Sequence, residues 1–381
     1  MFVSNTRLPH LLTPDRYYAE EAYREEVEGA LKASWHVVAT TAELSVPGAF
    51  VTTNLFGTPV QVRNFDGELS ALSNVCAHRH ALLSSARSGR SASMQCQYHG
   101  WEYQKDGSTG RIPQPKNFVP FDQPRPCLPR YAVEKVGQLV FVNLSAQPVP
   151  IQSFLGEDFY QLLSERFSEQ WTLSLKWNPD YAVNWKIPLE NSLEAYHVPN
   201  VHPHTFREDP GELKSEHVLL AHRTAFGTML PFSPHSRLDA MFQNCGGRLA
   251  KWLGHEVTNR YWQHHVFPNL LFSFTDAISL CNCILPTGAT TCSATVRQFG
   301  RLASNGKRVM RNRVAKLWAK LNALITKQIL VEDLGIFESI QAGMRASQQP
   351  GVLGRCEERI HRFQAFLQNS SKQRSTSEFE Q

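Results

Sequence analysis

The sequence predicts an α+β fold in which a small all-β domain precedes a larger domain with an antiparallel sheet packed by helices. Two observations support this class. Residues 35–144 consist of short segments rich in Val, Thr and Phe, divided by Pro-Gly and Asp-Gly turns, as expected of a domain built from strands alone. Later in the chain, strand-like segments are followed by residues 310–345, whose apolar positions recur with helical periodicity.

The remaining elements follow in order along the chain. Residues 16–34 combine mixed charges with good helix formers and predict a surface helix. Residues 174–188 alternate like a strand, residues 189–196 favour a helix, and residues 267–274 favour strands again. Residues 370–381 have almost nothing to bury and predict disorder. The expected divisions are an N-terminal helical segment packing on the larger domain (1–36), the small domain (37–148), the larger domain (149–369) and a disordered tail (370–381).

Composition and charge exclude several classes of protein. Lys and Arg number 39 against 34 Asp and Glu, a net charge of +5 without dense basic runs, so nucleic acid is not an expected partner. The longest uncharged stretch, Ala277 to Val296, is interrupted by Asn, Pro, Thr and Ser, which argues against a membrane span. The N-terminus lacks the sustained apolar region of a secretory signal, so the expected compartment is the cytoplasm. The eight cysteines are spread along the chain, which favours a metal site over a disulfide framework.

One group of cysteines and histidines has the spacing of a metal site. Cys76-x-His78 is followed, after seventeen residues, by Cys96-x-x-His99. Pairs of this kind on two loops suit a Rieske 2Fe-2S cluster, in which two Cys bind one iron and two His bind the other. Structural zinc is the alternative, although zinc modules usually group Cys with Cys and His with His, and coincidence is a third possibility.

A second group lies downstream, where His197 and His202 are five residues apart and cannot share one face of a regular helix. Pro199 is expected to bend the chain by disfavouring helix at Val198, so that His197 ends a helix and His202 returns from the following loop. Two imidazoles and one carboxylate form the facial triad of non-heme Fe(II) oxygenases.

The carboxylate of such a triad is expected from the late helix, where Glu332 and Asp333 are adjacent. The residues three and four positions either side of Asp333 are all apolar, so its charge would be strongly unfavourable there unless a cation such as Fe²⁺ compensated it. The neighbours of Glu332 are more polar, and its side chain is expected to be solvated. Asp333 is therefore the predicted ligand.

These segments resemble one known family. NVCAHRHA and CQYHGWEYQKDGS resemble the cluster loops of the oxygenase subunits of Rieske non-heme iron oxygenases, and EN-x2-E-x-YH-x4-H followed by ED-x7-Q-x-G resembles their catalytic domain in the same order. The resemblance implies that a 2Fe-2S cluster and a mononuclear Fe(II) are the cofactors. It assigns the cluster to Cys76, His78, Cys96 and His99, the iron to His197, His202 and Asp333, and a catalytic place to Asn191.

The same resemblance implies a role for Glu194. In the family, three subunits form a ring, and a carboxylate at this position accepts the N–H of the ligand histidine, here His197, and reaches the cluster histidine, here His99, of the adjacent subunit. Ring-hydroxylating members mostly have Asp there, whereas Glu is similar to members that act on quaternary ammonium compounds such as carnitine. An ordinary glutamate on a helix surface is the alternative.

The expected function is therefore that of a terminal oxygenase component, which takes electrons from a separate NAD(P)H-dependent reductase or ferredoxin and uses O₂ to hydroxylate or dealkylate a small organic substrate. The chain shows no GxGxxG nucleotide motif after a strand, which is why the reductase is expected to be separate. A Rieske-type electron carrier or redox sensor and a zinc-binding interaction module are the alternatives. Five aromatic residues, expected to line the pocket or to lie in the core, are Phe206, Phe226, Phe232, Phe242 and Tyr261.

Overall fold

The computed structural model describes residues 1–119, 125–202, 205, 208–230, 237–304 and 308–378. The chain divides into two compact units: Lys32–Ser164, the small unit, and Met1–Leu31 together with Glu165–Gln381, the large unit. The predicted α+β class is confirmed, since the small unit is built on a sheet and the large unit on a second sheet with helices. The division after Ser164 lies later than expected, because the Trp35 indole donates a hydrogen bond of 2.8 Å to the Val149 carbonyl and ties that segment to the small unit.

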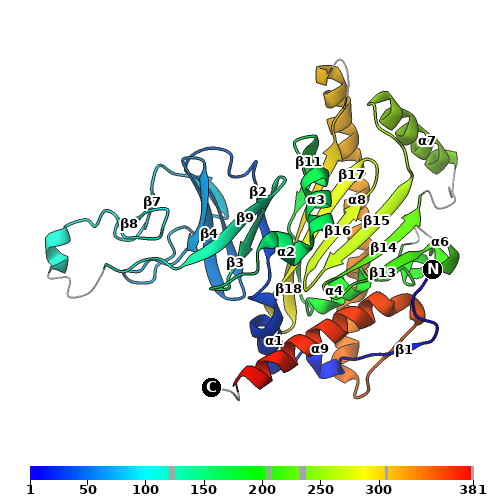
Figure 1. Ribbon diagram of the computed structural model, residues 1–381, viewed down its shortest axis with the longest axis horizontal. Coiled ribbons are helices and arrows are strands. Elements are labelled where there is room, and N and C mark those ends of the chain that lie inside the picture. Colours follow the sequence, from blue (N-terminus) through cyan, green and yellow to red (C-terminus); the bar gives the residue numbers. More distant parts are fainter. Residues whose placement is uncertain (120–124, 203–204, 206–207, 231–236, 305–307, 379–381) are drawn as a thin grey trace. The chain divides into compact units, whose positions relative to one another are not determined.

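The small unit contains an antiparallel sheet of seven strands in its described part (Figure 1). Val-rich segments form it because branched side chains pack well on a pleated, buried surface. Val60, Val62, Leu72 and Phe141 are fully buried in its core. Across the sheet the strands are β2 (His36–Thr40), β10 (Leu139–Asn143), β9 (Arg130–Val136), β5 (Glu68–Ser73), β4 (Thr58–Phe65), β3 (Ala49–Leu55) and β6 (Ser88–Arg90).

A separate hairpin lies at one end of the small unit (Figure 1). It consists of β7 (Met94–Gln95) and β8 (Glu102–Tyr103), and the 3-10 helix η3 (Pro115–Phe118) follows it. Helices α2 (Ile151–Leu155) and α3 (Glu157–Arg166) come after β10.

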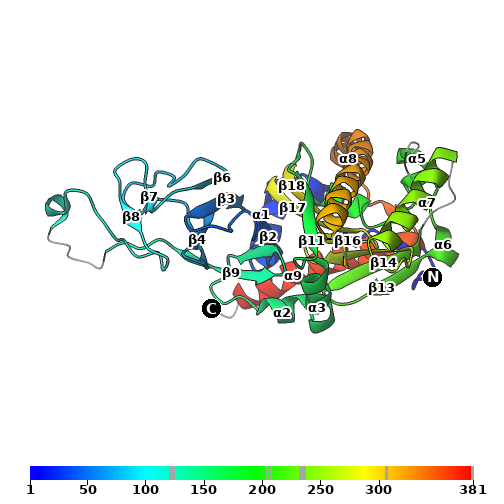
Figure 2. The same ribbon diagram turned by 90° about the horizontal axis from the view of Figure 1, so that it is seen from above.

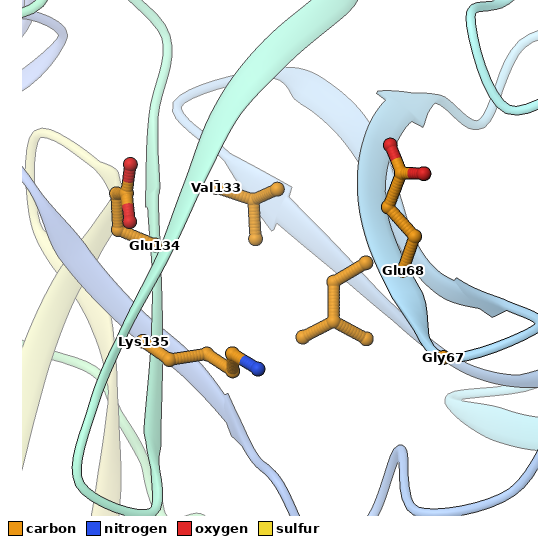
Figure 3. Close-up of a pocket in the computed structure, with 6 residues that line it drawn as sticks. Gly67, Glu68, Val133, Glu134 and Lys135 are labelled. Carbon is orange, nitrogen blue, oxygen red and sulfur yellow. The ribbon is translucent and has the colours of Figure 1, made fainter.

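Strands β5 and β9 pair only through Ala71 with Tyr131 and Leu72 with Arg130. Beyond that pairing they leave an open hollow, and Figure 3 shows charged side chains of both signs around it. The hollow is lined by Gly67, Glu68, Leu69, Val133, Glu134 and Lys135. None of these residues belongs to the predicted sites, so the hollow is not the predicted centre.

The large unit is built on a second antiparallel sheet, on which the short strand β12 (Asp180–Tyr181) also pairs with β18. Its long helix α8 lies along the sheet (Figures 1 and 2). A side chain at Gly300 would place its Cβ 2.1 Å from that of Ala319, so glycine is required for α8 to pack this closely on β18. The strand order is β11 (Trp171–Trp177), β18 (Thr291–Arg301), β17 (Ile278–Gly288), β16 (Leu270–Phe274), β15 (Arg260–Val266), β14 (Arg223–Met229) and β13 (Glu216–Leu219).

The N-terminal segment Met1–Leu31 belongs to the large unit, and a buried ion pair holds it in place. Lys186 Nζ lies 2.9 Å from Glu26 Oε1, and both side chains are almost completely buried. The N-terminal elements are β1 (Leu8–Pro9), which pairs with β19 (Val352–Leu353), then η1 (Pro14–Tyr17), α1 (Glu20–Glu26) and η2 (Val27–Leu31). The others are α4 (Lys186–Asn191), α5 (Val198–Val201), α6 (Gly211–Lys214), α7 (Arg237–Trp252), α8 (Arg308–Ala346), η4 (Arg355–Glu357) and α9 (Glu358–Glu378). Within the described ranges, no helix has both the length and the apolar character needed to cross a membrane.

The C-terminal segment differs from the expectation of disorder from residue 370. Helix α9 continues through Glu378, and residues 379–381 lie outside the described residues. Phe363 and Leu367 are buried and anchor the helix. Extending an existing helix needs no new nucleus, so a polar end with little to bury can still continue it.

Candidate metal centres

Two loops with the same hydrogen-bond pattern carry the cysteines and histidines of the small unit. In the first, the Cys76 N–H donates to the Ala81 carbonyl at 2.8 Å and the His80 N–H donates to the Cys76 carbonyl at 3.0 Å. In the second loop, Cys96, Trp101 and Gly100 make the corresponding bonds at 2.8 and 2.9 Å. His80 and Gly100, at equivalent positions, both have positive φ, of 60° and 72°. The sequence thus builds one tight loop twice, each loop beginning with a cysteine.

The side chains of these loops converge. His78 and His99 have ring centroids 4.8 Å apart, and His78 stacks on Trp101, also at 4.8 Å. Cys76 and Cys96 are each 2% exposed and belong to one apolar cluster. The Tyr103 hydroxyl lies 3.0 Å from Cys76 Sγ and accepts a hydrogen bond from the Ala77 N–H. The sequence did not indicate a role for Tyr103, although it lies within the motif that begins with Cys96.

This donor set fits a cluster with two sulfur and two nitrogen ligands. Burial raises the pKa of Cys96 and of Tyr103, while burial and the nearby His99 and Arg79 lower the pKa of His78. An imidazole that resists protonation keeps a lone pair for a metal, whereas a buried thiol gives up its proton when a metal replaces it. Two buried sulfurs beside two imidazoles suit soft and borderline metals, the chemistry that a Rieske cluster requires.

The two histidines predicted to bind iron flank a single helical turn. His197 is the N-terminal cap of α5, His202 is its C-terminal cap, and the Val201 N–H donates to the His197 carbonyl at 3.0 Å. The expected bend at Pro199 is therefore wrong, since Val198 is helical and Pro199 lies in the first turn. Proline is tolerated there because the first N–H groups of a helix have no partner within it. The expected helix over 189–196 is likewise shorter, as α4 ends at Asn191.

Helix α8 brings Asp333 to these histidines. One ligand atom from each of His197, His202 and Asp333 lies within 4.8 Å of the others. Asp333 Oδ1 is 3.1 Å from His202 Nε2 and 3.6 Å from His197 Nε2. The three predicted ligands thus meet at one point, with the same nitrogen of each ring facing the carboxylate.

The opposite nitrogen of each ring is held by a glutamate. Glu194 hydrogen-bonds His197 Nδ1 and also accepts the backbone N–H of His197 at 3.1 Å. Glu332 Oε2 lies 2.9 Å from His202 Nδ1 and 2.7 Å from the Thr205 hydroxyl. The expectation that Glu332 is solvated is wrong, because a segment distant in sequence covers it. Metal-binding histidines commonly donate their second N–H to a carboxylate, so both rings fit a metal at Nε2.

The remaining predicted residue, Asn191, also reaches this centre. Its side-chain amide donates to Asp333 Oδ1 at 2.9 Å, from the last turn of α4. Asn191 therefore orients the carboxylate and does not supply a further charged ligand.

The electrostatics of the centre favour a cation. Burial alone would lower the pKa of His197, but hydrogen bonds and charge from Asp333 and Glu194 outweigh burial and raise that pKa to about 9. Burial alone would raise the pKa of Asp333, but hydrogen bonds and charge from the two histidines outweigh burial and lower that pKa. Three carboxylates around two imidazoles thus stabilise positive charge, and a divalent metal supplies such charge.

The predicted aromatic residues are only partly described. Phe226 and Tyr261 lie on adjacent strands β14 and β15, with ring centroids 6.2 Å apart. Phe206 and Phe232 lie outside the described residues, as does the side chain of Phe242.

A Cys₂His₂ pair of loops on an all-β unit and a two-histidine, one-carboxylate centre on a sheet-and-helix unit define an iron protein with two different centres. Residues 168–371 match the family described as ring hydroxylating alpha subunit (catalytic domain), and residues 34–132 match the Rieske [2Fe-2S] domain. The chain belongs to the ring-hydroxylating alpha subunit family. This confirms the predicted family and its two cofactors, a Rieske 2Fe-2S cluster and mononuclear iron.

Curated relatives are similar over about half of the chain. The carnitine monooxygenase oxygenase subunit of Acinetobacter pittii is 29% identical over 191 residues, 49% of this chain and 51% of the relative. The glycine betaine monooxygenase oxygenase subunit of Pseudomonas aeruginosa is 28% identical, over 50% of this chain and 44% of the relative. The toluate 1,2-dioxygenase subunit alpha of Pseudomonas putida is 28% identical, over 46% and 41%. The chain thus spans about half the length of the curated relatives it matches.

Solved structures share the fold over nearly the whole chain. A quaternary ammonium Rieske monooxygenase in complex with an inhibitor superposes with a TM-score of 0.74 at 19% identity, covering 96% of this chain and 95% of that one. Naphthalene 1,2-dioxygenase with indole bound in the active site gives a TM-score of 0.69 at 19% identity, covering 95% and 92%.

Proposed function

We propose that this chain is the terminal oxygenase component of a multicomponent Rieske oxygenase, which uses O₂ to hydroxylate or oxidatively dealkylate a small organic substrate. The observation that carries the proposal is the convergence of His197, His202 and Asp333, with a carboxylate behind each histidine. An electron carrier has no use for such a centre, because a relay needs no open coordination positions.

The residues divide between two centres. Cys76, His78, Cys96 and His99 would hold the 2Fe-2S cluster, supported by the two equivalent loops that present them. His197, His202 and Asp333 would hold the iron. When bound, the cluster relays single electrons and the iron supplies oxygen activation. Glu194, Glu332 and Asn191 fix the orientation of the ligand side chains, so that the protein contributes a preformed geometry.

The partners follow from the need for electrons. We infer a separate NAD(P)H-dependent reductase or ferredoxin as donor and a homotrimer as the working assembly, with Glu194 as the bridge to His99 of the neighbouring subunit. Two observations support the bridge: Glu194 already contacts His197, and His99 is exposed on its loop. The substrate is a small charged molecule such as a quaternary ammonium compound, or an aromatic acid, in line with the names of the relatives.

Metal analysis and turnover test the proposal together. The full-length protein is expected to contain about three irons and two acid-labile sulfides per chain, whereas a carrier would contain two irons and a zinc module would contain zinc without sulfide. With a surrogate reductase, a panel of betaines and aromatic acids should show substrate-dependent O₂ consumption with formation of hydroxylated or dealkylated product. If the reductase reduces the cluster of an iron-replete protein but no substrate in the panel is oxidised, the electron-carrier alternative would be supported.

A further inference from the structure

One buried arginine of the large unit has an N–H group without a hydrogen-bond acceptor among the described residues. Arg359, in the first turn of α9, is 1% exposed. Its Nε donates to the Thr224 hydroxyl at 3.3 Å, and its Nη1 donates to Gln263 Oε1 at 2.9 Å and to the Leu193 carbonyl at 3.2 Å. Its Nη2 is buried and has no hydrogen-bond partner among the described residues.

Among the described residues no carboxylate forms an ion pair with Arg359, although the charge of Glu194 acts on it from a greater distance and raises its pKa. All three acceptors are neutral groups, and burial of a cation without an adjacent anion is unfavourable. Burial lowers the pKa of Arg359 to about 10, so the side chain is still protonated at neutral pH. Lys186, another fully buried cation of the large unit, has Glu26 at 2.9 Å instead. The protein therefore satisfies one buried cation internally and leaves the other with an unused donor.

The position of Arg359 connects it with the candidate iron centre. The carbonyl that it holds belongs to Leu193, the residue immediately before Glu194, which contacts His197. The guanidinium lies over the Phe226 ring, with Cζ 6.0 Å from the ring centroid. A molecule that reached Nη2 would therefore meet aromatic surface and would lie near the segment that carries the histidines.

The strands that contact Arg359 carry residues with some accessible surface. Phe226, Tyr261 and Gln263 are partly exposed, although they lie on strands β14 and β15 in the interior of the sheet order. The Tyr261 hydroxyl lies 3.2 Å from Ser273 Oγ. Because Thr224 and Phe226 pair with His265 and Gln263 across the two strands, all of these side chains point to the sheet face that Arg359 contacts.

We propose that Arg359 binds the carboxylate of the substrate through its free Nη2, with Phe226 and Tyr261 packing against the rest of the molecule. This rests on the proposed function and narrows its substrate class to carboxylic acids, whether zwitterionic betaines or aromatic acids. Charge-assisted hydrogen bonds to carboxylates are stronger than neutral ones, and the guanidinium geometry suits them. A neutral analogue of the substrate, such as an amide, would leave the buried charge of Arg359 without a counterion. The site should therefore bind the acid much more tightly than the amide.

Matched ligand pairs test the proposal without turnover. Dissociation constants would be measured by calorimetry on the metal-loaded, full-length protein for benzoate against benzamide and for glycine betaine against its amide, with acetate as competitor. The wild type should prefer at least one acid over its amide by roughly 10- to 100-fold. Arg359→Gln should lose that preference and Arg359→Lys should keep part of it. Arg362→Gln removes a charge from the same helix, where the Arg362 Nε donates to the Leu220 carbonyl at 3.1 Å, and should behave as wild type.

The outcomes separate this inference from the proposed function. A wild type with no preference for either acid, or an Arg359→Gln variant with an unchanged preference, overturns the carboxylate site. If Arg359→Gln does not fold, the acid and amide affinities of the wild type, together with competition by acetate, still test whether a carboxylate site exists. Iron and sulfide contents are measured on the same samples. A protein without these metals that still prefers acids contradicts only the oxygenase function, whereas an active oxygenase without the preference contradicts only the role of Arg359.

Discussion

Two adjacent residues of helix α8 contact opposite nitrogens of one imidazole: Glu332 lies 2.9 Å from Nδ1 of His202, while Asp333 lies 3.1 Å from its Nε2. A carboxylate can only accept, so without a metal both ring nitrogens face acceptors, and these outweigh burial and raise the pKa of His202. A metal at Nε2 would replace the proton there, while Glu332 keeps the N–H at Nδ1 and already fixes the orientation of the ring.

Loss of Glu332 should weaken the iron centre without affecting the cluster. Glu332→Ala removes the acceptor of His202 Nδ1, and loss of such partners typically lowers metal affinity about 10- to 100-fold. Iron affinity would be measured by competition with a chelator, with the visible spectrum of the cluster as internal reference. Glu338→Ala, on an exposed position of the same helix, should retain wild-type affinity. Equal affinities in the two variants would show that the hydrogen bond does not support the metal.

Removal of Asp333 should have a more severe effect. Asp333→Ala should abolish oxygenation, because it removes a carboxylate that faces both Nε2 atoms. The visible spectrum of the cluster should be intact, since its candidate ligands lie in the other unit. Iron analysis should show loss of about one iron per chain. If the variant lost its colour instead, the ligands of the two centres would be misassigned.

The sequence predicted the chemistry of both centres better than their local geometry. Cys76, His78, Cys96 and His99 could be selected as candidate cluster ligands because their spacing is restrictive. The apolar positions around Asp333 distinguished it from Glu332, but that comparison used neighbours on one helix only. Thr205 and His202 reach Glu332 from a distant segment, and helical periodicity contains no information on such contacts.

Arg359 and the segment around Pro199 show the same limit. The sequence around Arg359 is polar, like that of a solvent-exposed first helical turn. Arg359 is buried because α9 packs on β14 and β15. Pro199 was expected to break a helix, whereas it lies in the first turn of one, because the preference of proline depends on its place within the helix. Fold class and the choice of candidate ligands followed from pattern, but burial and capping required the tertiary structure.

The buried ion pair of Lys186 and Glu26 should contribute strongly to stability. Glu26→Gln leaves the lysine charge buried without its partner and should destabilise the large unit by about 3–5 kcal/mol. Denaturant unfolding would measure the change. Glu216→Gln breaks the exposed Glu216–Arg260 pair and should cost less than about 1 kcal/mol. Similar losses in both variants would contradict a special role for the buried pair.

Glu190 should make stability depend on pH. Burial raises its pKa to about 7, although Gln364 and Tyr17 donate hydrogen bonds to it. The folded state therefore holds a proton that the unfolded state releases at lower pH, and stability should fall as pH rises from about 4.5 to 7, by at most about 1.4 kcal/mol per unit. Glu190→Gln keeps a hydrogen-bond acceptor and should remove this component of the pH profile. An identical profile in the variant would assign the dependence to other groups.

The bridge assigned to Glu194 predicts a variant that keeps its metals and loses internal electron transfer. Glu194→Ala removes the partner of His197 Nδ1, so iron affinity should fall, and saturating iron is therefore supplied before the assay. With both centres loaded and reduced, substrate-dependent reoxidation of the cluster in a stopped-flow single turnover should slow by at least about tenfold. Glu194→Asp keeps the carboxylate and should recover part of the rate, which separates a bridging role from simple loss of packing. Wild-type single-turnover rates in Glu194→Ala would exclude Glu194 from the electron path and leave it only the orientation of His197.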